Sequence, residues 1–226
     1  MVERWDAERL RGPEVGDGLQ VYGGSAIGVA GWACPGDGAR EGTPRASAGC
    51  LASALPSSWL AMELPQEAIT YRPIGVIRSP HVDPAKTPIQ PTYAAGIRGT
   101  VELDPAYEEG LEDLEGFSHI VLLYHLHRAG PVRLRVVPFL DDRERGLFAT
   151  RAPCRPNPIG MSVVRLVRRE GRILHVENID ALDGTPVLDI KPHVARFGVD
   201  GAVRCGWQDA VDEDTASQRG RRDDRS

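Results

Sequence analysis

The sequence predicts an all-β fold, a barrel or sandwich of short antiparallel strands with one short helix and long loops. Short apolar or alternating runs, separated by turn signals, recur between residues 69 and 208. A single segment carries both a start and a stop signal for a helix. No GxGxxG loop follows a strand, and no β-α-β alternation occurs, which argues against a doubly wound nucleotide-binding sheet.

The composition divides the 226 residues into three parts. Residues 1–68 are rich in Gly, Ala, Ser and Pro, and we expect a disordered or mis-annotated N-terminal extension. Within it, residues 1–61 precede Met62, a candidate for the true start of translation. Residues 69–208 hold the β-barrel domain. Residues 209–226 are acidic and then arginine-rich, and we expect a disordered C-terminal tail.

Each element of the domain has a local signal. The apolar patterns predict strands at residues 71–78, 99–103, 117–127, 131–138, 161–168, 173–179, 187–190 and 201–207. The run 117–127 is the most apolar and is expected to be a central strand. The strands 161–168 and 173–179 are expected to pair around the turn between them. Asp104 and Pro105 begin the one helix, which Gly116 ends.

Two irregular stretches are typical of binding loops. The first, residues 81–98, is long and contains three prolines. The second, residues 148–162, has three prolines within six residues, which fix φ and remove backbone donors. This stiff loop carries Arg151, Arg155 and Asn157, and an arginine fork suits carboxylates and phosphates. It therefore indicates a site for an anionic or polar ligand, although a proline-rich connection with solvated arginines remains an alternative.

Charge and cysteine content restrict the setting. The net charge is −5, and residues 69–208 carry 18 basic against 17 acidic residues. This balance lacks a basic footprint for nucleic acid, so an RNA partner would require a local arginine cluster. The four cysteines form no CxxC pair, which predicts reduced thiols. No apolar run approaches the roughly 20 residues of a membrane helix, so we expect a cytoplasmic protein without membrane contact.

Five ordered blocks carry a family resemblance. They are residues 74–80, 117–120, 146–151, 155–162 and 183–192. In this order they resemble the TsaA-like family of S-adenosylmethionine-dependent tRNA methyltransferases, called TrmO. The resemblance covers about residues 69–208. It implies a β-barrel that forms a homodimer and methylates N6 of threonylcarbamoyladenosine, next to the anticodon in the tRNA anticodon loop, with S-adenosyl-L-methionine as cofactor.

The resemblance also implies the site. The residues that it places on the cofactor are Gln90, Pro91, Leu126, His127, Arg151, Met161, Ile179, Asp180, Ala181, Leu182 and Asp183. From the stiff loop itself, Arg155 and Asn157 are predicted to bind the tRNA substrate, although which of Arg151 and Arg155 holds the cofactor carboxylate and which a tRNA phosphate stays open. The catalytic candidates in the Asp-Ile-Lys-Pro motif are Asp189, Lys191 and His193, with Asp189 as the base that exposes the amide-like acceptor nitrogen.

The sequence departs from the family pattern at two positions. His193 stands where the family commonly has tyrosine, and Ile89 stands where it often has arginine. Many bacterial members carry a further C-terminal domain, for which this sequence has no counterpart. These differences bear on substrate choice and on how tRNA is held.

Two other functions stay open. A barrel of this kind could bind S-adenosylmethionine or a nucleoside without catalysis. Alternatively, His125 and His127, two apart on one predicted strand, could share a metal ion, with Cys154, Cys205 or His193 completing the ligand set. A hydrogen-bonded core histidine is the more common explanation of such spacing.

Overall fold

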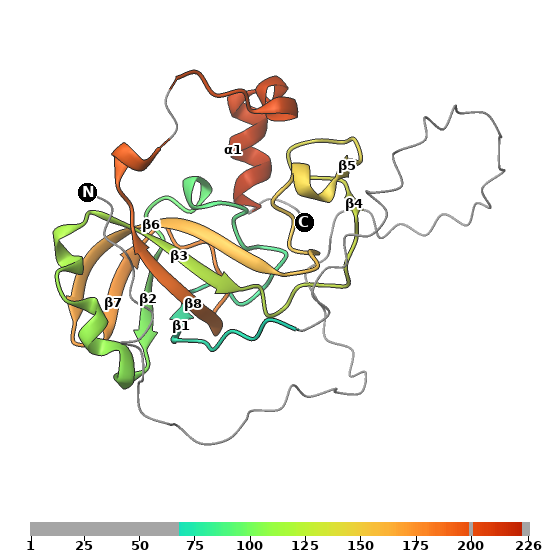
Figure 1. Cartoon of the computed structure of the whole chain (residues 1–226). Helices are drawn as coiled ribbons and strands as arrows, with labels where there is room; N and C mark the ends of the chain where they lie inside the picture. The colour runs from blue at the N-terminus through green and yellow to red at the C-terminus, as the bar shows by residue number, and fades with distance from the viewer. Residues whose placement is uncertain (1–67, 199–200, 223–226) are drawn as a thin grey trace, which may run out of the picture.

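The computed structural model describes residues 68–198 and 201–222. Six antiparallel strands close into a barrel in the order β1-β2-β7-β6-β3-β8 (Figure 1). They are β1 (Gly75–Arg78), β2 (Arg98–Leu103), β3 (His119–His125), β6 (Ile159–Glu170), β7 (Ile173–Glu177) and β8 (Thr185–Pro192). The predicted all-β class is confirmed, and the architecture is a barrel, which leaves no unpaired sheet edge.

The barrel core follows from the period-2 pattern of its strands. In β3, Ile120, Leu122 and Tyr124 are buried, and the residues between them are half-exposed. Because successive side chains of a strand point to opposite faces, one face fills the interior. Val164 of β6 and Leu174 of β7 join the same cluster. Each fully buried aliphatic side chain contributes about 1.5–3 kcal/mol.

The pairing of β6 with β7 was predicted and is confirmed. Both strands are antiparallel, with Glu170 opposite Ile173. Gly171 lies in the turn at φ 56°, a left-handed conformation that glycine adopts without steric cost. The hairpin brings the start of β6 and the segment after β7 to the barrel end where the site lies.

The predicted helix at 104–116 is a pair of 3₁₀ helices instead. These are η4 (Pro105–Leu111) and η5 (Leu114–Gly116). Asp104 caps η4 as expected, since its carboxylate accepts a 2.9 Å hydrogen bond from the Ala106 amide. Asp113 has φ 64°, and this left-handed residue separates the two turns, so no continuous α-helix forms.

Two strand predictions are wrong or too long. Of residues 131–138, only β4 (Arg135–Val136) is extended, and it pairs with β5 (Arg145–Gly146) in a small separate sheet. Residues 201–207 form no strand. Gly201 and Gly206 have φ of 84° and 62°, which break the extended run, and η8 (Gly206–Ala210) follows.

The expected disorder of residues 209–226 is wrong for most of that segment. It contains α1 (Glu213–Arg221), whose N-cap Asp212 accepts a 2.8 Å hydrogen bond from the Thr215 amide. The helix end packs on the loop 81–98, because the Ile89 amide donates to the Gly220 carbonyl at 3.1 Å. Figure 1 shows α1 beside η3 (Pro91–Tyr93) of that loop.

The remaining short elements are η6 (Leu147–Ala149) and η7 (Ala195–Phe197). In the part of the chain that the structure describes, no helix is long and apolar enough to cross a membrane. The predicted N-terminal extension, residues 1–68, lies outside the described residues except for its last position.

Candidate functional site

A pocket of about 220 Å³ lies at the barrel end where β3 finishes and where β6 and β8 begin. Four chain segments far apart in sequence supply its walls, namely the loop 81–98, the end of β3, the stiff loop 148–162 and the residues after β7. The residues predicted for cofactor or substrate that line it are Gln90, Leu126, His127, Arg151, Arg155, Met161, Asp180, Ala181 and Leu182. The predicted residues that do not line it are Pro91, Asn157, Ile179 and Asp183.

Arg151 joins the two loops that the sequence indicated as binding loops. Its Nη1 donates a 2.5 Å hydrogen bond to Gln90 Oε1, across 61 positions of sequence. Arg155 instead braces the stiff loop, since its Nη1 donates to the Thr150 carbonyl at 2.9 Å. Its guanidinium also lies 5.5 Å from the centre of the Phe148 ring. Arg151 is thus the better placed of the two arginines for a ligand carboxylate.

Gly160 makes room for the aromatic wall of the pocket. A Cβ at this position would lie 2.2 Å from the Tyr124 ring. The two residues are paired across β3 and β6, and the Tyr124 ring can lie over residue 160 only because glycine has no side chain. The backbone at Gly160 therefore lies directly against the Tyr124 ring.

A buried polar chain crosses the barrel interior beside the pocket. The Tyr124 hydroxyl lies 2.8 Å from Ser162 Oγ, which donates a 2.6 Å hydrogen bond to Asp180 Oδ1. Because the Ser162 hydroxyl directs its proton to Asp180, the Tyr124 hydroxyl is the donor in the hydrogen bond to Ser162 Oγ. The Ser162 and Asp180 residues are 1% and 6% exposed, so each polar group depends on its neighbour for compensation.

Burial sets the protonation of this chain. It raises the pKa of Asp180 to about 7, against the Ser162 hydrogen bond and the nearby Arg151 charge, which both lower it. Burial, and then the Asp180 charge, also raise the pKa of Tyr124, so its hydroxyl stays protonated. Sequence reasoning missed Tyr124 and Ser162. The available signal was a serine between Gly160 and Val164, on the inward face of β6, whose other buried positions are apolar.

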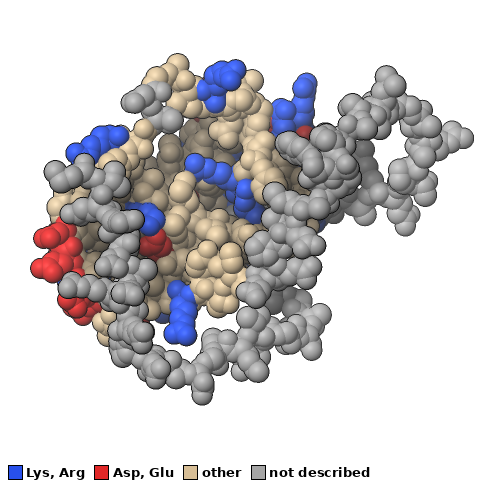
Figure 2. All heavy atoms as spheres, viewed as in Figure 1, with Lys and Arg blue, Asp and Glu red and all other residues tan. Residues whose placement is uncertain are grey.

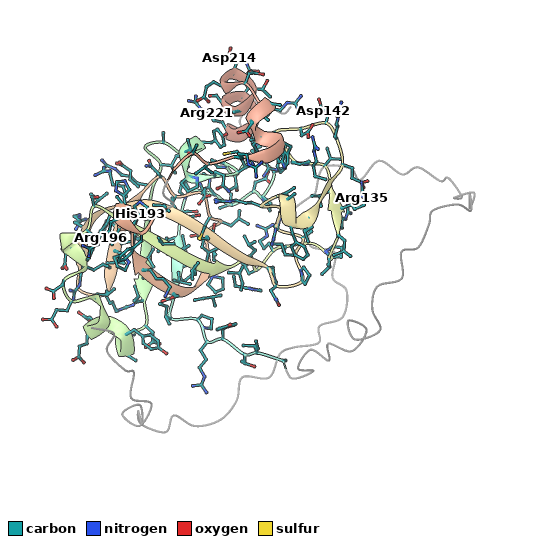
Figure 3. All side chains as sticks on the ribbon, turned by 45° about the horizontal axis from the view of Figure 1, so that its top comes forward. Arg135, Asp142, His193, Arg196, Asp214 and Arg221 are labelled. Atoms are coloured by element: carbon teal, nitrogen blue, oxygen red, sulfur yellow. The ribbon has the colours of Figure 1, made fainter. Side chains whose placement is uncertain are left out.

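The three catalytic candidates lie away from this pocket. Asp189 and Lys191 pair with each other, with Nζ and Oδ2 2.7 Å apart. Asp189 and Lys191 lie on β8, opposite Leu123 and Val121 of β3, and β8 runs from the pocket toward the other end of the barrel. At that end the His193 amide donates to the His119 carbonyl at 3.1 Å. Figure 3 shows His193 near Arg196, well separated from Arg135 of β4. Their catalytic roles stay predictions.

The proposed metal pair does not have the expected geometry. β3 ends at His125, and the His127 amide donates to the His125 carbonyl at 2.8 Å, so the chain turns and the two histidines do not share a strand face. The described residues contain no group of three or more His, Cys, Asp or Glu side chains able to hold a metal ion.

The cysteines and His127 have other environments. Cys154 is buried and disulfide-bonded, so the expectation of four reduced thiols is wrong for it. Cys205 is free and exposed. Loss of water around its ring, and then the charge of Arg128, lower the pKa of His127, which therefore lines the pocket as a neutral imidazole at pH 7.

Five arginines that could contribute to an RNA-binding cluster are held in ion pairs, on the barrel or on the separate β4–β5 sheet. The pairs are Arg135–Glu144, Arg145–Asp141, Arg165–Glu177, Arg168–Glu170 and Arg169–Glu115. Figure 2 shows basic side chains scattered over the visible face and acidic ones at the left edge, where η4 and η5 lie in Figure 1. No broad basic face is visible in this view.

The fold and the pocket define a class of protein, a closed β-barrel with a pocket at one end whose lining suits a small zwitterionic ligand. Arg151 supplies a guanidinium and Asp180 a carboxyl group within one pocket. Leu126 and Met161 add apolar surface to the same lining. S-adenosylmethionine has the matching set of groups, since it carries a carboxylate, an ammonium, a sulfonium and a planar base.

The chain belongs to the TrmO family. Residues 76–199 match the model of the tRNA-methyltransferase O N-terminal domain, which covers more than half of the chain. A crystal structure of TrmO from Pseudomonas aeruginosa superimposes with a TM-score of 0.52 at 43% identity, covering 62% of this chain and 63% of that one. The recognised family and its barrel are thereby confirmed.

Curated relatives are similar over the same region. A probable S-adenosyl-L-methionine-binding protein of Pyrococcus abyssi is 57% identical over 139 residues, which cover 62% of this chain and 76% of that protein. The human tRNA (adenine(37)-N6)-methyltransferase is 33% identical over 170 residues. That match covers 71% of this chain but only 36% of the human enzyme.

Proposed function

We propose that the barrel is a tRNA methyltransferase that holds S-adenosyl-L-methionine in the pocket at the end of β3 and methylates an adenine N6. The observation that carries this proposal is the pairing of Arg151 with Gln90 in a pocket that the buried Asp180 also lines. The opposite charges suit the two ends of a zwitterionic cofactor. Family membership and the names of the relatives support the same activity.

The cofactor, when bound, supplies a methyl group on a positively charged sulfur. Arg151 and Gln90 would hold its carboxylate, and Leu126 and Met161 would pack on its apolar parts. Fixing the donor in one orientation is the main contribution that such a pocket makes to a displacement reaction. The other residues predicted for the cofactor, Pro91, Ile179 and Asp183, would act by shaping the loops around them.

The acceptor that we propose is N6 of threonylcarbamoyladenosine beside the anticodon. An anticodon loop is single-stranded, so its modified base can be turned out of the stack toward a pocket. Arg155 and Asn157 on the stiff loop are the proposed tRNA contacts. Asp189 is the proposed base, supported by Lys191 and His193. The exposed Asp189, at 43% for its side chain, is accessible to a large substrate.

We further propose that residues 69–208 form the catalytic unit and that it acts as a cytoplasmic homodimer. Large apolar side chains are exposed near the pocket mouth, since Phe148 is 74% exposed and Met161 48%. Such side chains favour burial against a second copy. The oligomeric state follows from the mass in solution, and a purely monomeric protein would contradict this part.

The test is transfer of labelled methyl groups from S-adenosyl-L-methionine to purified tRNA. We expect incorporation into tRNA that carries threonylcarbamoyladenosine and none into the same transcript without it. Methylation of both tRNAs would contradict the proposed acceptor, but it would still show that the protein is a tRNA methyltransferase. A protein that binds the donor without transferring the methyl group would instead be a non-catalytic sensor, a reading favoured by the ion pair that Asp189 makes with Lys191.

A further inference from the structure

We propose that Asp180 is the residue by which this pocket distinguishes the cationic methyl donor from its neutral thioether product. The inference rests on the proposed function, because it assumes that S-adenosyl-L-methionine and S-adenosyl-L-homocysteine occupy this pocket. It assigns to Asp180 a specificity role that depends on its charge. The role differs from that of Arg151, whose partner on the ligand is the same in donor and product.

The charges of the pocket lining are unequal. Three arginines line it, Arg128, Arg151 and Arg155, and of the described residues in that lining Asp180 is the one acid. The donor carries an ammonium, a carboxylate and a sulfonium, and its net charge is +1. The product has lost the sulfonium charge and is neutral overall. Three guanidinium groups repel a net cation, so a pocket with neutral Asp180 would favour the product.

An ionised Asp180 reverses this preference. Its carboxylate opposes the arginines from within the barrel, where charges interact more strongly than in water. Ser162 occupies its Oδ1 with one hydrogen bond of 2.6 Å. A carboxylate offers about four acceptor positions, so this single side-chain bond leaves capacity for a ligand. Asp180 is itself one of the residues that line the pocket.

The position of Asp180 also allows its charge to change with the ligand. Burial holds the pKa of Asp180 at about 7, so the free protein is a mixture of both forms near neutral pH. The groups that act on it are the Tyr124 hydroxyl, the Ser162 hydroxyl and the Arg151 guanidinium, and the His127 imidazole lines the same pocket. A sulfonium nearby favours the charged form. Binding of the donor is then linked to loss of a proton to solvent, and binding of the product is not.

The experiment is calorimetric titration of the full chain with S-adenosyl-L-methionine and with S-adenosyl-L-homocysteine between about pH 5.5 and 7. In this range the α-amino group of both ligands stays protonated. The affinity for the donor relative to the product should rise about tenfold from the low to the high end of the range. Repeating the titrations in buffers of different ionisation enthalpy should show more proton release for the donor than for the product.

Two variants and a control locate the effect. Asp180→Asn should abolish the pH dependence of the affinity ratio and shift it toward the product. Ser162→Ala removes the donor that favours the charged form, so it should move the midpoint to higher pH. Asp113→Asn removes a charge from an exposed left-handed position outside the pocket lining. It should behave as wild type.

The outcomes distinguish failure of the role proposed for Asp180 from failure of the proposed methyltransferase function. A ratio that does not change with pH in the wild type, or a pH dependence that persists in Asp180→Asn and so belongs to His127, would overturn the inference and leave the function standing. Failure of both ligands to bind the wild type at any pH would instead contradict the proposed function itself.

Discussion

Ser162 Oγ donates a 2.6 Å hydrogen bond to Asp180 Oδ1 inside the barrel, linking β6 to the segment that follows β7. The bond lies beside a pocket, and both residues are almost fully buried. A buried carboxyl is costly in its charged form. We therefore expect the stability of the protein to depend on pH even without a ligand.

The first prediction concerns that dependence. The folded protein keeps a proton on Asp180 up to about pH 7, while the unfolded chain loses it near pH 4. Between these values the unfolded state binds fewer protons, so the contribution of Asp180 to stability falls as the pH rises. The free energy of unfolding of the wild type relative to Asp180→Asn should fall by up to about 1.4 kcal/mol per pH unit.

Urea unfolding of both proteins at pH 5, 6 and 7 measures this difference. Carboxyls with lowered pKa, such as Glu177 and Asp141, are present in both proteins and cancel. Parallel stability curves for wild type and Asp180→Asn would mean that Asp180 is already charged in the free protein.

The second prediction concerns Gly160. Its replacement by alanine would bring a Cβ to 2.2 Å from the Tyr124 ring. The strands or the ring must shift, and overpacking of this kind costs about 1–3 kcal/mol. Gly110→Ala is the control, because nothing lies within 4 Å of a Cβ there. Thermal unfolding should show a clear loss for Gly160→Ala only, and equal loss in both variants would argue against the tight contact.

The third prediction concerns the link between the two loops. Arg151→Ala and Gln90→Ala each break the 2.5 Å hydrogen bond between these side chains. Both should weaken binding of S-adenosyl-L-methionine, and the double variant should lose less than the sum of the two single losses, since the side chains act as a unit. Isothermal titration measures the cycle. Strictly additive losses would show that the two residues act on the ligand independently.

The fourth prediction concerns the proposed base. Asp189→Asn should lower turnover by about 10²-fold or more and leave cofactor affinity unchanged, because Asp189 does not line the pocket. Single-turnover methylation measures the rate of methyl transfer, and calorimetry measures the affinity for the cofactor. Glu170→Gln, which removes an exposed carboxylate at the β6–β7 turn, is the control and should keep full activity. Unchanged turnover in Asp189→Asn would place the base elsewhere.

Short strands joined by turn signals predicted an all-β barrel or sandwich, and the family resemblance implied the barrel. It failed where tertiary context decides the outcome. The Gly201–Trp207 run has apolar residues at strand spacing, but two left-handed glycines break it. The polar composition around Asp212 predicted a disordered tail, but the segment forms α1. The end of this helix packs on the loop at Ile89, a contact that the local sequence does not reveal.

The site was predictable in its loops and less so in its interior. Proline content and arginine type identified the stiff loop of Arg151 and Arg155. Family motifs identified Asp180, but nothing in the sequence shows that Ser162 lies beside it. That contact depends on the register of β6 and β7 and on closure of the barrel, which are long-range properties.

The central claim is that this chain methylates threonylcarbamoyladenosine in tRNA. Mass analysis of nucleosides from the tRNA of cells with and without the gene for this chain tests it most directly. We predict that the N6-methylated form of threonylcarbamoyladenosine is present with the gene, absent without it, and restored by the wild type but reduced with Arg151→Ala. Equal amounts of the methylated nucleoside in both cell lines would contradict the account.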